Sequence, residues 1–201
     1  MIAIIDYGSG NIKSLQFALE KVGLSPQITI DETVIATSDA IILPGVGAFQ
    51  DAMQALNNQG LTEIIKREAD NGKPVLGICL GMQLFYEISE EDGEAEGLGL
   101  LKGRVSKITG KVKVPHMGWN SLSKHQSSPL VNQILEYSFV YFVHSYAVKE
   151  YAENTLIATC DYAGTIPAIV QQGNIIGMQF HPEKSGDIGL KLLENVREMM
   201  L

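Results

Sequence analysis

Cysteine and long apolar runs are scarce in this chain, and their scarcity excludes several classes of protein. Only Cys79 and Cys160 occur among 201 residues, so a disulfide-stapled scaffold is excluded and a reducing, cytoplasmic compartment is expected. No apolar stretch approaches the length that a membrane span needs. The apolar run at residues 2–5 has no basic region before it and is too short for a signal peptide.

Basic residues are outnumbered as well. The 15 Lys and Arg against 23 Asp and Glu give a net charge of −8, which argues against nucleic acid and favours a small substrate or a protein partner. The His and Cys residues are scattered without the spacing of metal ligands, so no metal is expected. Residues 6–10 begin like a dinucleotide-binding loop, but Lys13 stands where the third glycine belongs. We therefore expect no cofactor.

The segment at residues 73–83, KPVLGICLGMQ, is the most informative part of the chain. An apolar strand leads into Cys79, which lies between Gly77 and Gly81, and a helix-forming stretch follows. This pattern is typical of a nucleophile elbow, a strained strand-to-helix turn that presents a nucleophile above a sheet. Side chains at the glycine positions would collide with the neighbouring strand and helix, and N–H groups of the new helix would favour the thiolate. Cys79 is therefore predicted to be a catalytic nucleophile, and Cys160 a core thiol.

Strands and helices alternate through the first half of the chain. Apolar runs predict buried strands at residues 2–6, 40–43 and 75–78. Helical periodicity predicts helices at 12–22, from about 51 to 71, and after Cys79. This order indicates parallel strands joined by right-handed crossovers.

The second half is richer in strand signals. A strand is expected at 139–143, and a hairpin at 168–178 around the turn residues 171–174, before a final helix at 185–201. The acidic stretch 87–96 is interpreted as a solvated loop. The chain is therefore predicted to be one α/β domain, residues 1–201, with an open, mixed, mostly parallel sheet flanked by helices and antiparallel hairpins in its C-terminal half.

A cysteine nucleophile needs a base and a group that orients the base. His181 and Glu183 follow the strand-like run 175–180, at the carboxyl end where Cys79 would also lie. His181 would take the thiol proton and later protonate the leaving amine, while Glu183 would hold the imidazole in its productive tautomer. His116, His125 and His144 are the alternatives for the base.

Acyl chemistry also needs N–H donors for the developing oxyanion. The backbone N–H of Leu80 is one candidate. The loop Gly45-Val46-Gly47 is the other, because its glycines let the backbone approach closely.

Taken in this order, the elbow, the glycine loop and the C-terminal His-Pro-Glu resemble the class I (triad) glutamine amidotransferases. Further segments narrow the resemblance to the histidine-biosynthesis branch, the glutaminase subunits of imidazole glycerol phosphate synthase. These are PHMGWN at 115–120, YFVHSY at 141–146 and QFHPEKS at 179–185, together with Met82 in the elbow.

The resemblance implies a flavodoxin-like core and hydrolysis of glutamine through a glutamyl thioester. It implies a triad of Cys79, His181 and Glu183, and it implies that the amino-acid end of glutamine is held by Gln83 and by the backbone of Ser145 and Tyr146.

The resemblance also implies a partner, a (β/α)₈-barrel cyclase subunit in a heterodimer. The cyclase would use the ammonia to make imidazole glycerol phosphate and an aminoimidazole carboxamide ribonucleotide. Trp119, Asn11 and the loop at 45–47 would lie near the interface. Docking would switch on the glutaminase, and a peptide flip in the glycine loop would complete the oxyanion hole.

Three rival functions are weighed against this one. Amidotransferases for anthranilate, carbamoyl phosphate or pyridoxal phosphate synthesis are disfavoured by Met82, Lys184 and residues 116–120. A cysteine peptidase or other hydrolase would act without a partner. A binding module with a dead site is disfavoured because the candidate nucleophile, base and orienting carboxylate are all present.

Overall fold

The main sheet of the protein takes strands from both halves of the chain, in a computed structural model that describes residues 1–8, 10 and 12–200. Its strand order is β2-β1-β3-β4-β14-β13-β12-β9. The first five strands run parallel and the last three add antiparallel pairs. In that order the strands are β2 (Pro26–Thr29), β1 (Ile2–Ile5), β3 (Ala40–Gly45), β4 (Val75–Cys79), β14 (Ile175–Met178), β13 (Thr165–Gln172), β12 (Leu156–Asp161) and β9 (Ser123–Lys124).

The register of the central strands gathers the predicted site at one edge of this sheet. β4 lies between β3 and β14 and is parallel to both, with Gly45 opposite Cys79 and Met178 opposite Ile78. The carboxyl ends of parallel strands are where ligand and catalytic groups collect in such sheets. The loop after β3, Cys79 and the segment that leads to His181 therefore start from neighbouring positions.

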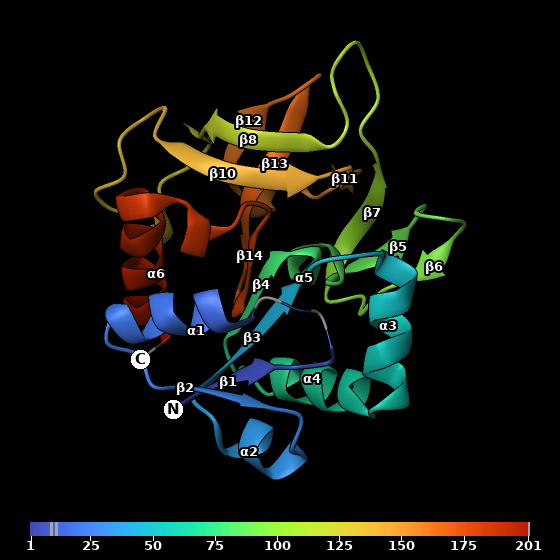
Figure 1. Cartoon of the computed structure of the whole chain (residues 1–201), viewed down its shortest axis with the longest axis vertical. Coiled ribbons are helices and arrows are strands. Elements are labelled where there is room, and N and C mark those ends of the chain that lie inside the picture. Colours follow the sequence, from blue (N-terminus) through green and yellow to red (C-terminus); the bar gives the residue numbers. More distant parts are fainter. Residues whose placement is uncertain (9, 11, 201) are drawn as a thin grey trace.

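Two smaller sheets complete the β structure. One pairs β8 (His116–Ser121) with β10 (Phe139–His144), and Figure 1 shows the pair lying across the end of the main sheet beyond α5 (Leu80–Gln83). The other has the order β11-β7-β5-β6, formed by β11 (Tyr146–Lys149), β7 (Leu101–Lys107), β5 (Tyr86–Ser89) and β6 (Ala95–Glu96). Three 3-10 helices join these elements: η1 (Pro129–Val131), η2 (Glu153–Thr155) and η3 (Pro182–Lys184).

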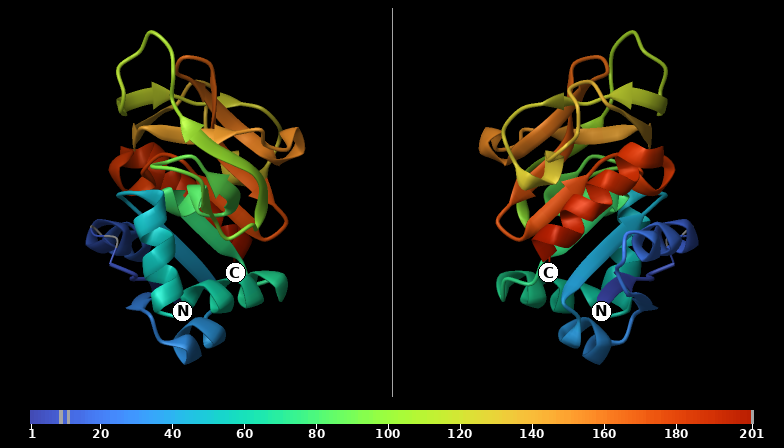
Figure 2. Two further views of the ribbon diagram at one scale, coloured as in Figure 1. Left: turned by 90° about the vertical axis from the view of Figure 1, so that its right-hand side faces the viewer. Right: turned by 90° about the vertical axis from the view of Figure 1, so that its left-hand side faces the viewer.

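Helices cover both faces of the parallel strands, because alternate residues of each strand face opposite sides. Ile2 and Ile4 pack in one apolar cluster with α1 (Ile12–Lys21) and α6 (Gly186–Met200). Their neighbours Ala3 and Ile5 pack in the second cluster. That cluster includes residues of α2 (Glu32–Thr37), α3 (Phe49–Asn58) and α4 (Leu61–Asp70). The side views in Figure 2 place most strands of the second half, coloured yellow to orange, at the end of the molecule away from the N-terminus.

The predicted α/β class, the strand at 139–143 and the hairpin around Gly173 are confirmed. The single helix expected at about 51–71 was wrong: α3 ends at Asn58, and Gly60, at φ 70°, starts a separate helix. The helix after Cys79 is also shorter than expected, since α5 (Leu80–Gln83) is one turn before β5 begins. Within the described residues, no helix is long and apolar enough to cross a membrane.

Candidate active site

Cys79 lies on a strained turn between β4 and α5. Its backbone has φ 54° and ψ −111°, a conformation that non-glycine residues rarely adopt. The glycines on either side make this turn possible. A Cβ on Gly81 would overlap the carbonyl oxygen of Leu43, and a Cβ on Gly77 would lie 2.6 Å from the Phe85 ring. The packing therefore confirms the steric requirement for glycine that was expected at these two positions.

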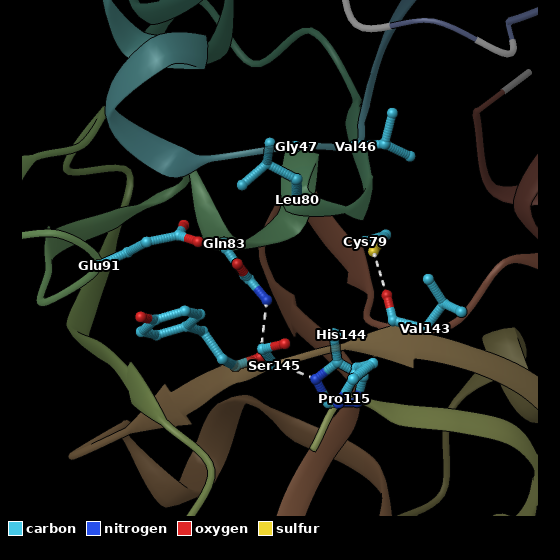
Figure 3. A pocket seen from close by; sticks show the side chains of 11 residues that line it. Val46, Gly47, Cys79, Leu80, Gln83, Glu91, Pro115, Val143, His144 and Ser145 are labelled. Atoms are coloured by element: carbon cyan, nitrogen blue, oxygen red, sulfur yellow. Dashed lines mark hydrogen bonds between the residues drawn. The ribbon is translucent and has the colours of Figure 1, made fainter.

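Among the described residues, two make a hydrogen bond of good geometry with the Cys79 sulfur. Its thiol donates to the Val143 carbonyl oxygen at 3.6 Å (Figure 3), and the Gln179 side-chain N–H donates to the sulfur at 3.8 Å. Gln179 is fully buried. Neither residue could be singled out from the sequence, because both lie within apolar strand patterns.

His181 and Glu183 form a buried pair beyond the end of β14. His181 Nδ1 lies 2.9 Å from Glu183 Oε1, and each side chain is 5% exposed. The backbone of His181 is fixed by three hydrogen bonds: its N–H donates to the Tyr141 carbonyl at 2.9 Å, and its carbonyl accepts from the Ser185 hydroxyl at 2.6 Å and from the Lys184 N–H at 3.0 Å. The imidazole is therefore held in place by both its ring and its main chain.

Three influences set the protonation of His181. Burial lowers its pKa, but the Cys79 sulfur and the Glu183 carboxylate together raise the pKa above its ordinary value. The other ring nitrogen, Nε2, is buried and has no hydrogen-bond partner of good geometry among the described residues. With Nδ1 donating to Glu183, Nε2 is the atom free to exchange a proton with a thiol or a leaving group.

The residues predicted to stabilise an oxyanion divide into two groups. Leu80, Val46 and Gly47 line a pocket together with Cys79. Gly45 instead packs behind the elbow, where a Cβ would lie 2.5 Å from the Tyr7 hydroxyl and 3.0 Å from the Gly81 nitrogen. Close packing, more than exposure to a substrate, explains why glycine is needed at position 45.

The residues predicted to hold substrate all line the same pocket, as Figure 3 shows for Gln83 and Ser145. Gln83 is nevertheless buried, and its amide N–H groups are already engaged. They donate to the Tyr146 carbonyl at 2.9 Å and to the Gln179 side-chain oxygen at 3.0 Å. Gln83 thus joins the elbow helix to the opposite side of the pocket.

Glu91 also lines the pocket, and the sequence interpretation missed it. Its Oε2 accepts the N–H of Phe49 at 2.8 Å, at the start of α3, and burial raises the pKa of its carboxyl. The interpretation of the acidic stretch 87–96 as a solvated loop was wrong at this position, and it was also wrong at both ends of the stretch, which belong to β5 and β6. No local pattern distinguishes Glu91 from the other acids around it; only the fold does.

The remaining predicted residues are divided between the pocket, the surface and the core. His144 lines the pocket and contacts the buried His116, whereas His125 is exposed on the surface beside Glu153. Trp119 is 56% exposed. Asn11 lies outside the described residues. Cys160 is buried, and burial raises the pKa of its thiol to about 12, so it is unreactive. The described residues contain no His, Cys, Asp and Glu cluster suited to a metal ion.

Comparison with known proteins assigns the chain to a family. Residues 3–198 match the family model described as glutamine amidotransferase class-I. The chain is a class I glutamine amidotransferase. The resemblance seen in the sequence is therefore confirmed, and this amidotransferase carries Cys79 and His181 on the elements expected for them.

Curated relatives narrow the family. The imidazole glycerol phosphate synthase subunit HisH of Oceanobacillus iheyensis is 61% identical over 200 residues, covering 100% of both chains. The protein of the same name from Bacillus cereus strain ATCC 14579 is 49% identical over 195 residues, covering 97% of this chain and 93% of its own.

Solved structures support the fold. PurLQS from Thermotoga maritima aligns with a TM-score of 0.80 at 20% identity, covering 100% of this amidotransferase and 98% of the other chain. A structure titled "Crystal structure of glutamine amidotransferase" aligns with a TM-score of 0.77 at 18% identity, covering 98% of each chain.

Proposed function

We propose that this protein is the glutaminase subunit of imidazole glycerol phosphate synthase. It hydrolyses glutamine to glutamate and ammonia and passes the ammonia to a synthase partner in histidine biosynthesis. The full-length match at 61% identity to a subunit of that name carries the proposal. The placement of Cys79 beside the buried His181–Glu183 pair supports it chemically.

In the first half-reaction, the Cys79 thiolate attacks the side-chain amide carbon of glutamine, and a C–S bond forms. The oxyanion is stabilised by the N–H of Leu80 and by the loop at Val46 and Gly47, which line the same pocket. His181 then gives its Nε2 proton to the departing nitrogen as the C–N bond breaks. The products are ammonia and a glutamyl thioester.

In the second half-reaction, water attacks the thioester carbonyl and His181 takes a proton from that water. The C–S bond breaks, glutamate leaves, and the sulfur and imidazole return to their starting state. Glu183 keeps Nδ1 protonated and stabilises the positive imidazolium through both steps.

The amino-acid end of glutamine needs one partner for its ammonium and one for its carboxylate. Glu91 places a carboxylate on the pocket wall, and we assign it to the ammonium. The backbone at Ser145 and Tyr146, on the opposite side, is assigned to the carboxylate end, with Gln83 holding that backbone in place.

Apolar side chains on β8 and β10 offer a surface for the partner. Met117 is 63%, Trp119 56% and Phe139 57% exposed, and the antiparallel register places all three on the outer side of the β8–β10 pair. We call these three residues the docking surface. Exposed apolar groups that cluster in this way mark protein interfaces. We propose a (β/α)₈-barrel cyclase as the occupant, in a heterodimer.

We also propose that residues 1–201 form a single functional domain. The main sheet supports this, because β4 from the first half is hydrogen-bonded to β14 from the second. Neither half would retain both Cys79 and His181 if the chain were divided.

Synthesis of imidazole glycerol phosphate from glutamine, compared with synthesis from ammonium salts, tests the proposal. The assembled synthase should make imidazole glycerol phosphate from glutamine, and Cys79→Ala should lose this activity by at least about 10⁴-fold. The same variant should still support synthesis from added ammonium salts, since the partner alone consumes ammonia. Glutamine use retained by Cys79→Ala would refute the nucleophile.

Docking has its own test. Trp119→Ala should weaken binding to the cyclase by about tenfold or more, as expected for a central aromatic contact. Ile30→Ala, a change at another exposed apolar residue that lies beyond β2, is the matched control and should leave the affinity unchanged. Equal binding by both variants would remove Trp119 from the interface.

A further inference from the structure

Two buried histidines that the reaction does not use form part of a continuous hydrogen-bonded chain. Asn120 Nδ2 lies 3.2 Å from His116 Nε2, His116 Nδ1 lies 3.0 Å from His144 Nε2, and His144 Nδ1 lies 2.7 Å from the Tyr146 carbonyl oxygen. His116 is 3% and His144 6% exposed. The chain ends at the pocket wall, since His144 and Tyr146 both line the pocket.

The two ends of this chain fix the direction of every hydrogen bond in it. A carbonyl oxygen only accepts, so His144 must carry its proton on Nδ1 and present Nε2 as an acceptor. His116 must then donate from Nδ1, which leaves its Nε2 to accept from the Asn120 amide. Asn120 is oriented to do so, because its nitrogen also donates to the Asp161 carbonyl at 3.0 Å and its oxygen accepts the Ser121 N–H at 2.8 Å.

Both rings are therefore neutral, and both are Nδ1–H tautomers. A second proton on His144, at Nε2, would face the His116 Nδ1–H across the 3.0 Å contact, and a second proton on His116, at Nε2, would face the Asn120 amide N–H at 3.2 Å. Burial lowers the pKa of both histidines to about 4, and the nearby His181 disfavours a charge on His144 further. The His116 ring is also clamped between Tyr162 and Phe142, with centroids 3.8 and 4.7 Å away.

The carbonyl at the end of the chain connects it to the nucleophile. The Tyr146 oxygen accepts a second hydrogen bond, from Gln83, which donates to Gln179 as well. Gln179 in turn donates to the Cys79 sulfur at 3.8 Å. An unbroken series of polar contacts thus runs from the inner side of β8 to the elbow.

We propose that His116 and His144 are positioning residues whose fixed Nδ1–H tautomers hold the Tyr146 carbonyl in place. That carbonyl sets the position of the substrate-binding backbone and of the Gln83–Gln179 pair. Neither histidine exchanges a proton during the reaction. The consequence for glutamine binding rests on the proposed function; the tautomers do not.

Histidine ¹⁵N spectra of the wild-type protein test the tautomers directly. Both rings should show a protonated Nδ1 and an unprotonated Nε2 from pH 5.5 to 8, without titrating. Assignment comes from the signals lost in His116→Gln and His144→Gln, or, where a variant does not fold, from through-space contacts of the clamped His116 ring. An Nε2–H tautomer in either ring, or titration of either near pH 6.5, would overturn the proposal.

A pair of substitutions at position 144 tests the consequence for binding. An asparagine amide reaches the place of Nδ1, so His144→Asn keeps a donor for Tyr146, whereas the amide of His144→Gln extends toward the place of Nε2 and loses that donor. In the assembled synthase, His144→Gln should raise the KM for glutamine about tenfold, the factor that corresponds to one hydrogen bond, with kcat within about twofold. His144→Asn should stay within about twofold of wild type in both constants.

The ¹⁵N spectra and the kinetics of the position-144 variants together distinguish failure of this inference from failure of the proposed function. A purely structural role for His144 predicts the same loss of thermal stability in both variants and no change in KM, which would overturn the inference. A wild-type protein that releases no glutamate from glutamine even in the assembled synthase would refute the proposed function while leaving the tautomer result intact.

Discussion

The two walls of the pocket are held in position by different kinds of interaction. The elbow wall depends on steric fit: Gly77 and Gly81 leave no room for a Cβ, and Cys79 takes up the strained conformation between them. The opposite wall, around Val143 and Tyr146, depends on hydrogen bonds between polar side chains and the main chain.

The difference affects how each wall responds to change. A steric overlap on the elbow wall cannot be relieved in part, because the backbone carbonyl that a new methyl group would overlap has no room to move. On the hydrogen-bonded wall, each substitution should remove only about the free energy that one hydrogen bond contributes. Substitutions on the elbow wall should therefore remove the fold or the activity, and substitutions on the opposite wall should adjust binding.

Gly81→Ala is expected to have the largest effect. The new Cβ would overlap the Leu43 carbonyl oxygen, so the free energy of unfolding should fall by more than about 4 kcal/mol, measured by urea denaturation. Gly173→Ala is the control, since its φ is 57° and nothing lies within 4 Å; it should cost about 1–2 kcal/mol from backbone strain alone. Equal losses would mean that the Leu43 carbonyl moves aside and that overlap does not limit the elbow.

Glu183→Gln should lower kcat for glutamine hydrolysis by about 10²–10⁴-fold. The amide preserves shape but removes the negative charge that helps to raise the pKa of His181. The alkaline limb of the pH–rate profile should accordingly move to lower pH. An unchanged profile would show that Glu183 only orients the ring.

Glu91→Gln should raise the KM for glutamine about tenfold or more while kcat changes little, since a charge-assisted bond to the substrate ammonium is lost. Glu90→Gln, which alters the neighbouring acid that pairs with Arg104 at 3.1 Å, should leave the KM unchanged. Steady-state kinetics on the assembled synthase compare the two. If the neighbouring substitution had the same effect, the general acidity of the loop would be responsible.

The last and most gradual effect is a dependence of stability on pH. His116 has a pKa of about 4 when folded and 6.5 as a free group, so below pH 6.5 the unfolded chain binds a proton that the folded chain does not. Its contribution should make the free energy of unfolding fall with decreasing pH by up to about 1.4 kcal/mol per unit between 6.5 and 4. In His116→Gln, the free energy of unfolding should fall less steeply with decreasing pH, by the amount that corresponds to one proton.

His181 acts in a different pH range and does not confuse this measurement. Its pKa is raised on folding, so its contribution to stability is complete below about pH 6.5 and is lost as the pH rises through the folded value. Denaturation series from pH 5 to 6.5 therefore report on the neutral histidines. Identical slopes in wild type and variant would mean that His116 is not held neutral.

The sequence specified the elbow wall and much of the fold because both depend on local patterns. Apolar runs defined β3 and β4, and the glycines beside Cys79 indicated the turn. The break between α3 and α4 was missed because the helical periodicity continues across Gly60, and only the left-handed conformation at that residue separates them. The short β2 and α2 gave too little periodic signal to be predicted.

The opposite wall was much less predictable, because its residues meet only through tertiary contacts. Gln83 and Gln179 are 96 positions apart, and Glu91 reaches Phe49 across 42 positions. His116 and His144 could be proposed as alternative bases, but their mutual contact follows from the register of β8 against β10. The roles of Cys79, His181 and Glu183 stay predictions that the kinetics above address.

Successive residues of β8 face opposite sides of the strand and have different proposed roles. Met117 and Trp119 point outward and belong to the docking surface, whereas His116 and Asn120 point inward and belong to the hydrogen-bonded chain. A substitution scan along β8 should therefore give alternating phenotypes: partner affinity changes at odd positions and glutamine KM at even ones. Any insertion of one residue would exchange the two sets and disable both at once, so length variation inside this strand should be far rarer than sequence variation.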